Sequence, residues 1–598
     1  MSVRFLNNNA SNNTDVVSKT FPSKELTLWV RNPSWPACEA NSGDNRVRGL
    51  YAVWPDGANF IAMTVSAAYT VDYGDGTTTN YTSGTTAYYE YTYSDTDLVG
   101  TEAPVTFTDS GDLVTRTAHG YSNDMQVQFF NITSTTGISN GQFYYVINAT
   151  ANTFQVSATA GGTAVALTTD GTGQLLPYRI ATVTITPQAA NNLTSINLFV
   201  KHNQSGLADG YSTGWLDLAY AASTITSLTI GNSTTTVRLN NLERVRLNQL
   251  GSITSFSNLF QNLFLLQNLE IASTITTITN MTLMFSSCIN LQTVPLFNTA
   301  SVTNMTSMFN SCRRLQTVPL LNTASVTNMT SMFNSCSSLQ TLPLFNTASV
   351  NTMSSMFGTC VSLKTVPLFN TASVTDMSSM FSGCSSLQEV PLLNTASVTT
   401  MSSMFGTCTS LQTVPLFNTI LVNTMSSMFS SCFSLFTVPL FNTVAVTNMS
   451  SMFATCVSLK TVPLLNTAIV TNMSTMFSSC VSLKNIPLFN TVAVTNMGSM
   501  FSGCNSLTSI PALITTAVTS LSNFSNIFST CNSLARIEAK NFRFTFSVAS
   551  CKLSATSLDE IYTNLPIAVS QTITVTGNYG TATDNPAIAT AKGWTVTG

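Results

Sequence analysis

The middle of the chain repeats one pattern of apolar and polar residues every 24 positions. In one unit the apolar positions follow the i, i+3, i+4, i+7 spacing of a short helix with a single buried face. This stripe consists of Val302, Met305, Met308, Phe309, Cys312 and Leu315. Thr303 or Asn304 is the predicted N-cap. Because Thr, Ser and Asn fill the outer face and have low helix propensity, we expect packing against adjacent units to stabilise the helix.

A short strand is predicted after the helix, since Leu315, Val318 and Leu320 have the L-x-x-L-x-L spacing of a leucine-rich repeat. We expect the strands of successive units to pair in parallel, with Val318 and Leu320 pointing inward. Pro319 lacks a backbone N–H group and therefore weakens that pairing. Asn322 follows the strand, and we expect the column of its equivalents to bond the turn backbone of the next unit.

The pattern predicts a solenoid, because a 24-residue unit cannot bury its own apolar face and must stack on its neighbours. The regular array runs over residues 281–511. Divergent units at 211–280 and 512–598 are typical of caps, and the C-terminal cap is expected to contain a helix and strands over 552–598.

The residues ahead of the array have a different pattern. Residues 26–96 alternate apolar and polar positions between turn clusters, which is typical of antiparallel strands. Their expected closing strand appears at 178–185, so we assign 26–96 and 178–210 to one β-sandwich and 97–177 to an inserted β-module. Residues 1–25 are rich in Asn and Ser and lack a pattern, which predicts an extended arm that orders against a partner.

The strand assignment also predicts which side chains face solvent. If Leu315, Val318 and Leu320 point inward, the outward columns are those of Gln316, Thr317, Pro319 and Leu321. The polar column includes Gln316, Gln340, Lys364, Gln388 and Gln412. The apolar column consists of Phe297, Leu321, Phe345, Phe369, Leu393, Phe417, Phe441, Leu465 and Phe489. Such a stripe exceeds the patch that monomers usually expose. Three interpretations are open: a subunit interface, a platform for glycan or protein receptors, or a core column, in which case the inward and outward assignment is partly wrong.

Thirteen cysteines raise the question of disulfides or a metal site. Ten of them recur once per unit on the predicted buried stripe, where Cys packs as a small apolar residue, and C-x-x-C pairs with nearby histidines are absent from the sequence. We therefore predict buried, reduced thiols, no metal and no cofactor. Asp72 and Asp75 flank a Gly-rich turn, where they either bind calcium or, as we favour, shape the turn through hydrogen bonds to its backbone.

Residues for catalysis are scarce. The two histidines, His119 and His202, lie in different predicted modules and are expected to be surface or turn residues. Between Met281 and Leu507 the only carboxylates are Asp376 and Glu389, which fall in different columns of the repeat. An enzyme is therefore not expected, and a glycan hydrolase, which needs two carboxylates in one cleft, is the least favoured function.

The low charge of the chain limits the classes of partner that it can bind. Only 8% of the residues are charged and the net charge is −3, so the chain lacks the basic patch that nucleic acid requires. No apolar run approaches the roughly 20 residues of a membrane span. The first residues also lack the apolar segment of a signal peptide.

Three stretches resemble known families. The pattern V-T-N-M-x-x-M-F-x-x-C-x-x-L-x-x-V-P-L-x-N, from Val302 to Asn322, resembles the BspA-like leucine-rich repeats of bacterial surface proteins and of many bacteriophage virion proteins. The segment YTVDYGDG at 69–76, followed by Tyr88–Tyr93, looks like a PKD-like, immunoglobulin-type sandwich. The insert, with AHGYSNDMQVQFF and GQFYYVINATANTFQVSAT, is similar to a small β-module common in phage tail and capsid proteins.

These resemblances imply a multidomain protein: an N-terminal all-β sandwich with a β insertion, then a right-handed leucine-rich-repeat solenoid with a short strand and a short helix per rung. They imply a phage virion structural protein, such as a tail fibre, baseplate or capsid-decoration subunit, assembled in the host cytoplasm. Its expected partners are other virion proteins, a second copy in a homo-oligomer, and a host-surface glycan or protein. The lack of a signal peptide favours this role over a secreted bacterial adhesin, the first alternative.

Overall fold

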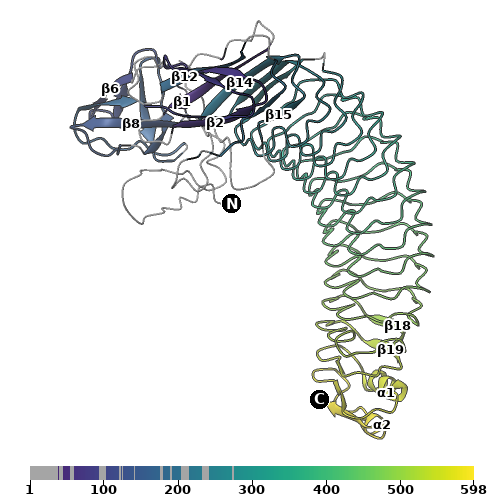
Figure 1. The fold of residues 1–598 in the computed structure, drawn as a ribbon. Coiled ribbons are helices and arrows are strands. Elements are labelled where there is room, and N and C mark those ends of the chain that lie inside the picture. The colour runs from purple at the N-terminus through teal and green to yellow at the C-terminus, as the bar shows by residue number, and fades with distance from the viewer. Residues whose placement is uncertain are drawn as a thin grey trace. The chain divides into compact units, whose positions relative to one another are not determined.

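The computed structural model describes part of the chain. The described residues are Cys38, 45–53, 59–92, 103–119, 121, 123, 126–140, 142–159, 161–175, 179–188, 192–201, 203, 214–231, 242–272 and 275–598. The predicted arm at 1–25 and His202 lie outside them. The chain forms two compact units, one of residues 1–277 with 288–291 and one of residues 278–287 with 292–598 (Figure 1).

The first unit contains two open β-sheets. The larger has the order β17-β16-β14-β1-β12-β3-β4, and its strands are β1 (Arg46–Val53), β3 (Tyr69–Asp72), β4 (Thr78–Tyr81), β12 (Arg179–Pro187), β14 (Trp215–Ala222), β16 (Arg244–Leu250) and β17 (Asn268–Ile271). The smaller has the order β15-β13-β2-β5, with β2 (Phe60–Val65), β5 (Thr86–Glu90), β13 (Ser195–Asn197) and β15 (Ser227–Thr229). Strand β12, at the place of the expected closing strand, pairs antiparallel with both β1 and β3. The PKD-like assignment itself stays a prediction.

Between β5 and β12 the chain forms a closed barrel of order β10-β7-β6-β11-β8-β9. Its strands are β6 (Ala103–Thr108), β7 (Leu113–Thr115), β8 (Gln126–Thr133), β9 (Phe143–Ile147), β10 (Thr153–Ser157) and β11 (Gly171–Leu175). Alternating residues such as Val105 and Phe107 on β6 and Val127 and Phe129 on β8 fill its core. This barrel occupies the stretch that the sequence predicts as an insertion.

Strand β14 joins two kinds of pairing in one sheet. It pairs antiparallel with β1 and parallel with β16, and β16 pairs parallel with β17. All eight residues of β14 are buried. Strands β16 and β17 carry the residues predicted as degenerate rungs, so within this unit those rungs continue the sheet of β1 and do not start a separate domain.

The second unit is a stack of 24-residue rungs, as predicted, but the predicted helix in each rung does not form. Ser307 and Ser311 have φ of 53° and 62°, in the left-handed region that interrupts a helix. Every second N–H donates to a carbonyl of the next rung, for example from Phe309 to Met332 at 2.9 Å. The N–H groups between them close tight turns, such as Met308 to Met305 at 3.2 Å. The segment is therefore a ladder of stacked turns.

The predicted strand is also absent from the described rungs at 292–508, where the chain turns after the proline. The N–H of Leu321 donates to the carbonyl of Pro319 at 2.9 Å, which closes a three-residue γ-turn around Leu320. The same bond recurs in later rungs, for example from Phe345 to Pro343 at 3.0 Å. Proline offers no N–H to a ladder, and the γ-turn bends the chain at this point, so it does not continue as a strand.

Regular strands return in the C-terminal part, where β18 (Ser509–Ile514) pairs parallel with β19 (Arg536–Lys540). The cap contains β20 (Phe546–Ser547), α1 (Ala555–Asn564), β21 (Gln571–Thr574), α2 (Ala587–Thr590) and β22 (Trp594–Thr597). The predicted helix and strands over 552–598 thus form.

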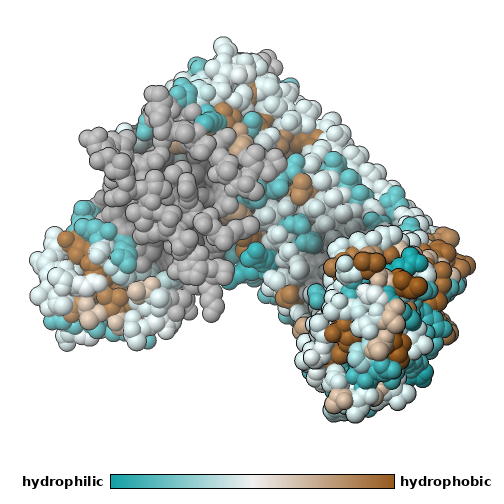
Figure 2. Space-filling view, turned by 90° about the horizontal axis from the view of Figure 1, so that it is seen from below, coloured by the Kyte–Doolittle hydropathy of each residue, from teal (hydrophilic) through white to brown (hydrophobic). Residues whose placement is uncertain are grey.

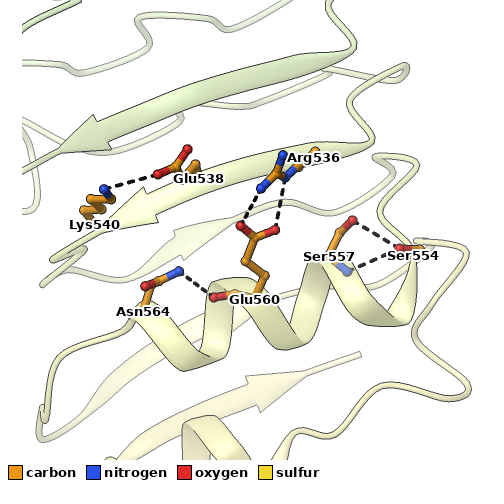
Figure 3. A network of polar contacts seen from close by, with 7 residues as sticks. All are labelled: Arg536, Glu538, Lys540, Ser554, Ser557, Glu560 and Asn564. Atoms are coloured by element: carbon orange, nitrogen blue, oxygen red, sulfur yellow. Dashed lines mark hydrogen bonds and ion pairs between the residues drawn. The ribbon is translucent and has the colours of Figure 1, made fainter. Parts of the chain in front are cut away.

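Polar contacts fix α1 to the rung before it (Figure 3). Arg536 on β19 donates two hydrogen bonds, of 3.1 and 2.9 Å, to the carboxylate of Glu560 on α1, and these bonds lower the pKa of that carboxyl group. Ser554 caps the helix by accepting the N–H of Ser557. The contact is exposed, so it orients the helix more than it stabilises it.

Candidate interaction surface

The stripe predicted as buried is the core of the stack. Met305, Met308, Phe309, Cys312 and Leu315 have no exposed surface, and the same holds for their equivalents from Met329 to Leu507. The phenylalanine rings stack from rung to rung, with centroids 5.5 Å apart between Phe309 and Phe333 and 5.7 Å apart between Phe381 and Phe405. The predicted core composition is confirmed, although the backbone that carries it is not helical.

The column predicted to face outward with apolar side chains is buried. Its nine residues are 1–5% exposed: Phe297, Leu321, Phe345, Phe369, Leu393, Phe417, Phe441, Leu465 and Phe489. Phe345 stacks on Phe333 of the other column at 6.1 Å. The assignment of inside and outside is therefore partly wrong, as the third interpretation states, and this column is core, whereas Val318 is buried as predicted. The γ-turn is the physical cause, because it breaks the alternation on which the strand assignment rested.

Leucine takes the outward position instead. Nine leucines at the centre of the proline segment are 59–66% exposed and form what we call the leucine ridge: Leu296, Leu320, Leu344, Leu368, Leu392, Leu416, Leu440, Leu464 and Leu488. Leu320 had been predicted to point inward, and this prediction is wrong. One signal was present in the sequence: this position is leucine in all nine units, whereas the buried position after it varies between Phe and Leu.

The columns beside the ridge are mostly uncharged. The predicted polar column is exposed at Gln316, Gln340, Lys364, Gln388 and Gln412. In this column and the next one along the rung, the charged residues over 292–488 are Lys364, Glu389, Lys460 and Lys484. The prolines, such as Pro319, directly precede the ridge leucines along the chain and are half-buried. Figure 2 shows a molecular surface that is mainly of intermediate hydropathy, with separate apolar patches.

Buried threonines fasten one rung to the next. The hydroxyl of Thr323 donates to the carbonyl of Asn346 in the following rung at 2.7 Å, and equivalent bonds of 2.7–2.9 Å run from Thr299 to Thr491. The Asn322 side chain accepts the N–H of Ala324 in its own rung at 3.2 Å. The prediction that this asparagine bonds the next rung is wrong, since its amide closes a local turn.

The predicted burial of the thiols is confirmed. All thirteen cysteines lie among the described residues, are buried, and take part in no disulfide there. In the array each thiol donates to a phenylalanine carbonyl of the preceding rung, for example from Cys384 to Phe357 at 3.0 Å. Burial raises the pKa of Cys360 and Cys432 to about 12 and that of Cys384 well above its usual range. These thiols are therefore protonated at neutral pH and poor nucleophiles.

The other candidate side chains are used in local structure. Asp72 accepts the N–H of Gly74 at 2.9 Å, and Asp75 accepts the N–H of Thr77 at 3.0 Å, so both shape the turn as favoured. His119 was predicted as a surface or turn residue; it directly follows a turn and is buried. Its Nδ1 accepts the N–H of Tyr121 at 2.9 Å.

The array carboxylates are equally local. Asp376 accepts the N–H of Ser378 at 2.8 Å, whereas Glu389 lies exposed in a column beside the leucine ridge. Among the described residues, no group of three or more His, Cys, Asp or Glu side chains is arranged to hold a metal ion. The described helices include none that is long and apolar enough to cross a membrane.

Comparisons with known proteins find one family model and solved structures of leucine-rich repeat proteins. A family model described as "Mycoplasma protein of unknown function, DUF285" matches residues 254–367, 361–461 and 436–542, just under half of the chain. A leucine-rich repeat protein from Bacteroides ovatus ATCC 8483 is 17% identical over 64% of this chain and 90% of its own, with a TM-score of 0.31. One from Eubacterium ventriosum ATCC 27560 is 15% identical over 50% of this chain and 78% of its own, with a TM-score of 0.28. A search of curated proteins finds no match.

Proposed function

We propose that this protein is a structural subunit of a phage particle, a tail fibre, baseplate or capsid-decoration protein, and that it acts by making contacts and not by catalysis. The observation that carries a contact role is the leucine ridge, in which nine identical exposed side chains repeat along one face of the stack. A long periodic surface suits a macromolecular partner better than a small molecule.

The virion assignment is supported by the sequence resemblances and not by the ridge. The repeat resembles that of many virion proteins, and the two N-terminal modules resemble a PKD-like sandwich and a phage β-module. We propose a division of labour in which the N-terminal part, including the arm at 1–25, docks on the particle. The array then contacts other virion proteins or a host-surface glycan or protein.

Two deletions in the phage genome test this proposal. Removing residues 1–24 is expected to abolish incorporation of the protein into particles. Removing the single rung 384–407 is expected to leave it incorporated, because each rung contacts only its neighbours and the flanking rungs can bond to each other. Incorporation is measured by imaging purified particles with an antibody against this chain. Particles that carry the armless protein but exclude the rung deletion would reverse the division of labour, and unlabelled wild-type particles would favour the adhesin alternative.

A further inference from the structure

We propose that the leucine ridge is the contact surface of a homodimer, in which two copies of this chain pack ridge against ridge. The proposal names the partner of the surface on which the proposed function rests. The area of the ridge suits a protein partner, and its charge and its periodicity favour a second copy over an unrelated one.

The first property is area. Complete burial of an aliphatic side chain removes roughly 60–120 Å² of apolar surface from water. Nine leucines that are about six-tenths exposed therefore offer on the order of 500 Å² per copy. A stable protein interface buries about 800 Å² on each partner. The flanking glutamine, threonine and proline columns supply the remainder when the ridge is covered.

The second property is charge. The two exposed columns beside the ridge hold 18 side chains over 292–488, of which Lys364, Lys460, Lys484 and Glu389 are charged. Two copies of this face therefore meet with few like charges opposite each other and with little charge to desolvate. An anionic glycan or a strongly charged protein would find few complementary groups on the same surface.

The third property is periodicity. The ridge repeats once per rung, at a spacing that the backbone bonds between rungs fix. An unrelated partner has no reason to share that spacing, whereas a second copy necessarily does. A two-fold axis across the ridge then makes each contact of one copy occur a second time, with the roles of the two copies exchanged. The half-buried prolines, such as Pro367, directly precede the exposed leucines of the ridge.

Sedimentation of the purified full-length protein tests the proposal. The wild type is expected to dimerise at micromolar concentration. The triple variant Leu368→Gln, Leu392→Gln and Leu416→Gln is expected to raise the dimer Kd roughly 100-fold or more, because it removes a third of the ridge. The matched control is Val361→Gln, Phe433→Gln and Val481→Gln. These three apolar residues are 36–42% exposed in the column after the cysteines, and the control is expected to stay dimeric.

A second readout covers a variant that folds poorly. Leu392→Cys places one exposed thiol on the ridge, while all native thiols are buried. Thiol-specific cross-linking is expected to join two copies of this variant and not of Val361→Cys. A monomeric wild type at 100 µM, or a control as monomeric as the ridge variant, would overturn the proposal. Because these measurements need no particle, they can fail while incorporation into virions holds, and the reverse is equally detectable.

Discussion

The two sides of a rung differ in how many of their backbone N–H groups bond to the neighbouring rung. On the turn side, from Met305 to Leu315, alternate N–H groups bond to the next rung and the side chains of the stripe are fully buried. On the proline side, from Gln316 to Asn322, one N–H bonds to the neighbouring rung, at 3.1 Å to Gln292, and another closes the γ-turn. Most of the bonds and the buried contacts between rungs therefore lie on the turn side, and the exposed leucines lie on the proline side.

The largest expected effect is a loss of stability of the rung stack at alkaline pH. Burial raises the pKa of Cys360 and Cys432 from 9.0 to about 12, so the folded thiols keep their protons where unfolded ones lose them. The contribution of these protonated thiols to the free energy of unfolding is complete below about pH 9. It falls as the pH rises toward 12, by about 1.4 kcal/mol per pH unit for each thiol exposed on unfolding. Denaturant melts at pH 8 and 10.5 measure it.

The double variant Cys360→Ala and Cys432→Ala is the control for this prediction. Its free energy of unfolding should fall less between pH 8 and 10.5 than that of the wild type, because two of the buried thiols are missing. Equal wild-type stability at both pH values would contradict the role assigned to the column.

A pair of truncations compares the two sides directly. Phe381→Ala removes a fully buried ring and is expected to destabilise the array by about 3–5 kcal/mol. Leu392→Ala, on the ridge of the same rung repeat, removes an exposed side chain and should change the stability of the monomer by less than about 0.5 kcal/mol. Hydrogen exchange should show lost protection only in the rungs next to Phe381. Equal destabilisation by the two truncations would mean that the ridge also belongs to the core.

The smallest effect concerns the threonine bonds. Thr371→Val removes the hydroxyl that donates to the carbonyl of Asn394 at 2.7 Å and is expected to cost about 1 kcal/mol, since that carbonyl loses a buried partner. Thr365→Val, at an exposed position of the preceding segment, should be nearly neutral. A thermal melt of each variant measures the difference. A neutral Thr371→Val would show that water replaces the bond.

The periodicity of the sequence predicted the turn side well and the proline side poorly. Met305, Met308, Phe309 and Cys312 were placed in the core because a chain of turns and a helix both bring every third or fourth residue to one face. The helix itself could not be excluded from the sequence, since the positive φ of Ser307 and Ser311 depends on bonds to the next rung.

The error on the proline side has a similar origin. A strand assignment puts Leu320 inside and Leu321 outside, and the γ-turn at Pro319 exchanges them. A hydrogen bond between residues i and i+2 cannot be predicted from the pattern of apolar and polar positions. The identity of the residue did leave one, because a core position accepts either Phe or Leu, whereas the exposed position is leucine nine times.

The sameness of the rungs has a consequence for folding. From Asn304 to Asn472 each rung meets the next through the same bridge, so any rung can dock on any other with nearly the same bonds. A nascent chain can therefore skip a rung, extrude 24 residues as a loop, and still form a well-bonded stack. The irregular units at the two ends of the array distinguish the correct order. Strand β16 pairs with β17 ahead of the array, and after it the spacing from Cys504 to Cys531 lengthens and β18 pairs with β19. These irregular units therefore fix the register in which the nearly identical rungs between them stack.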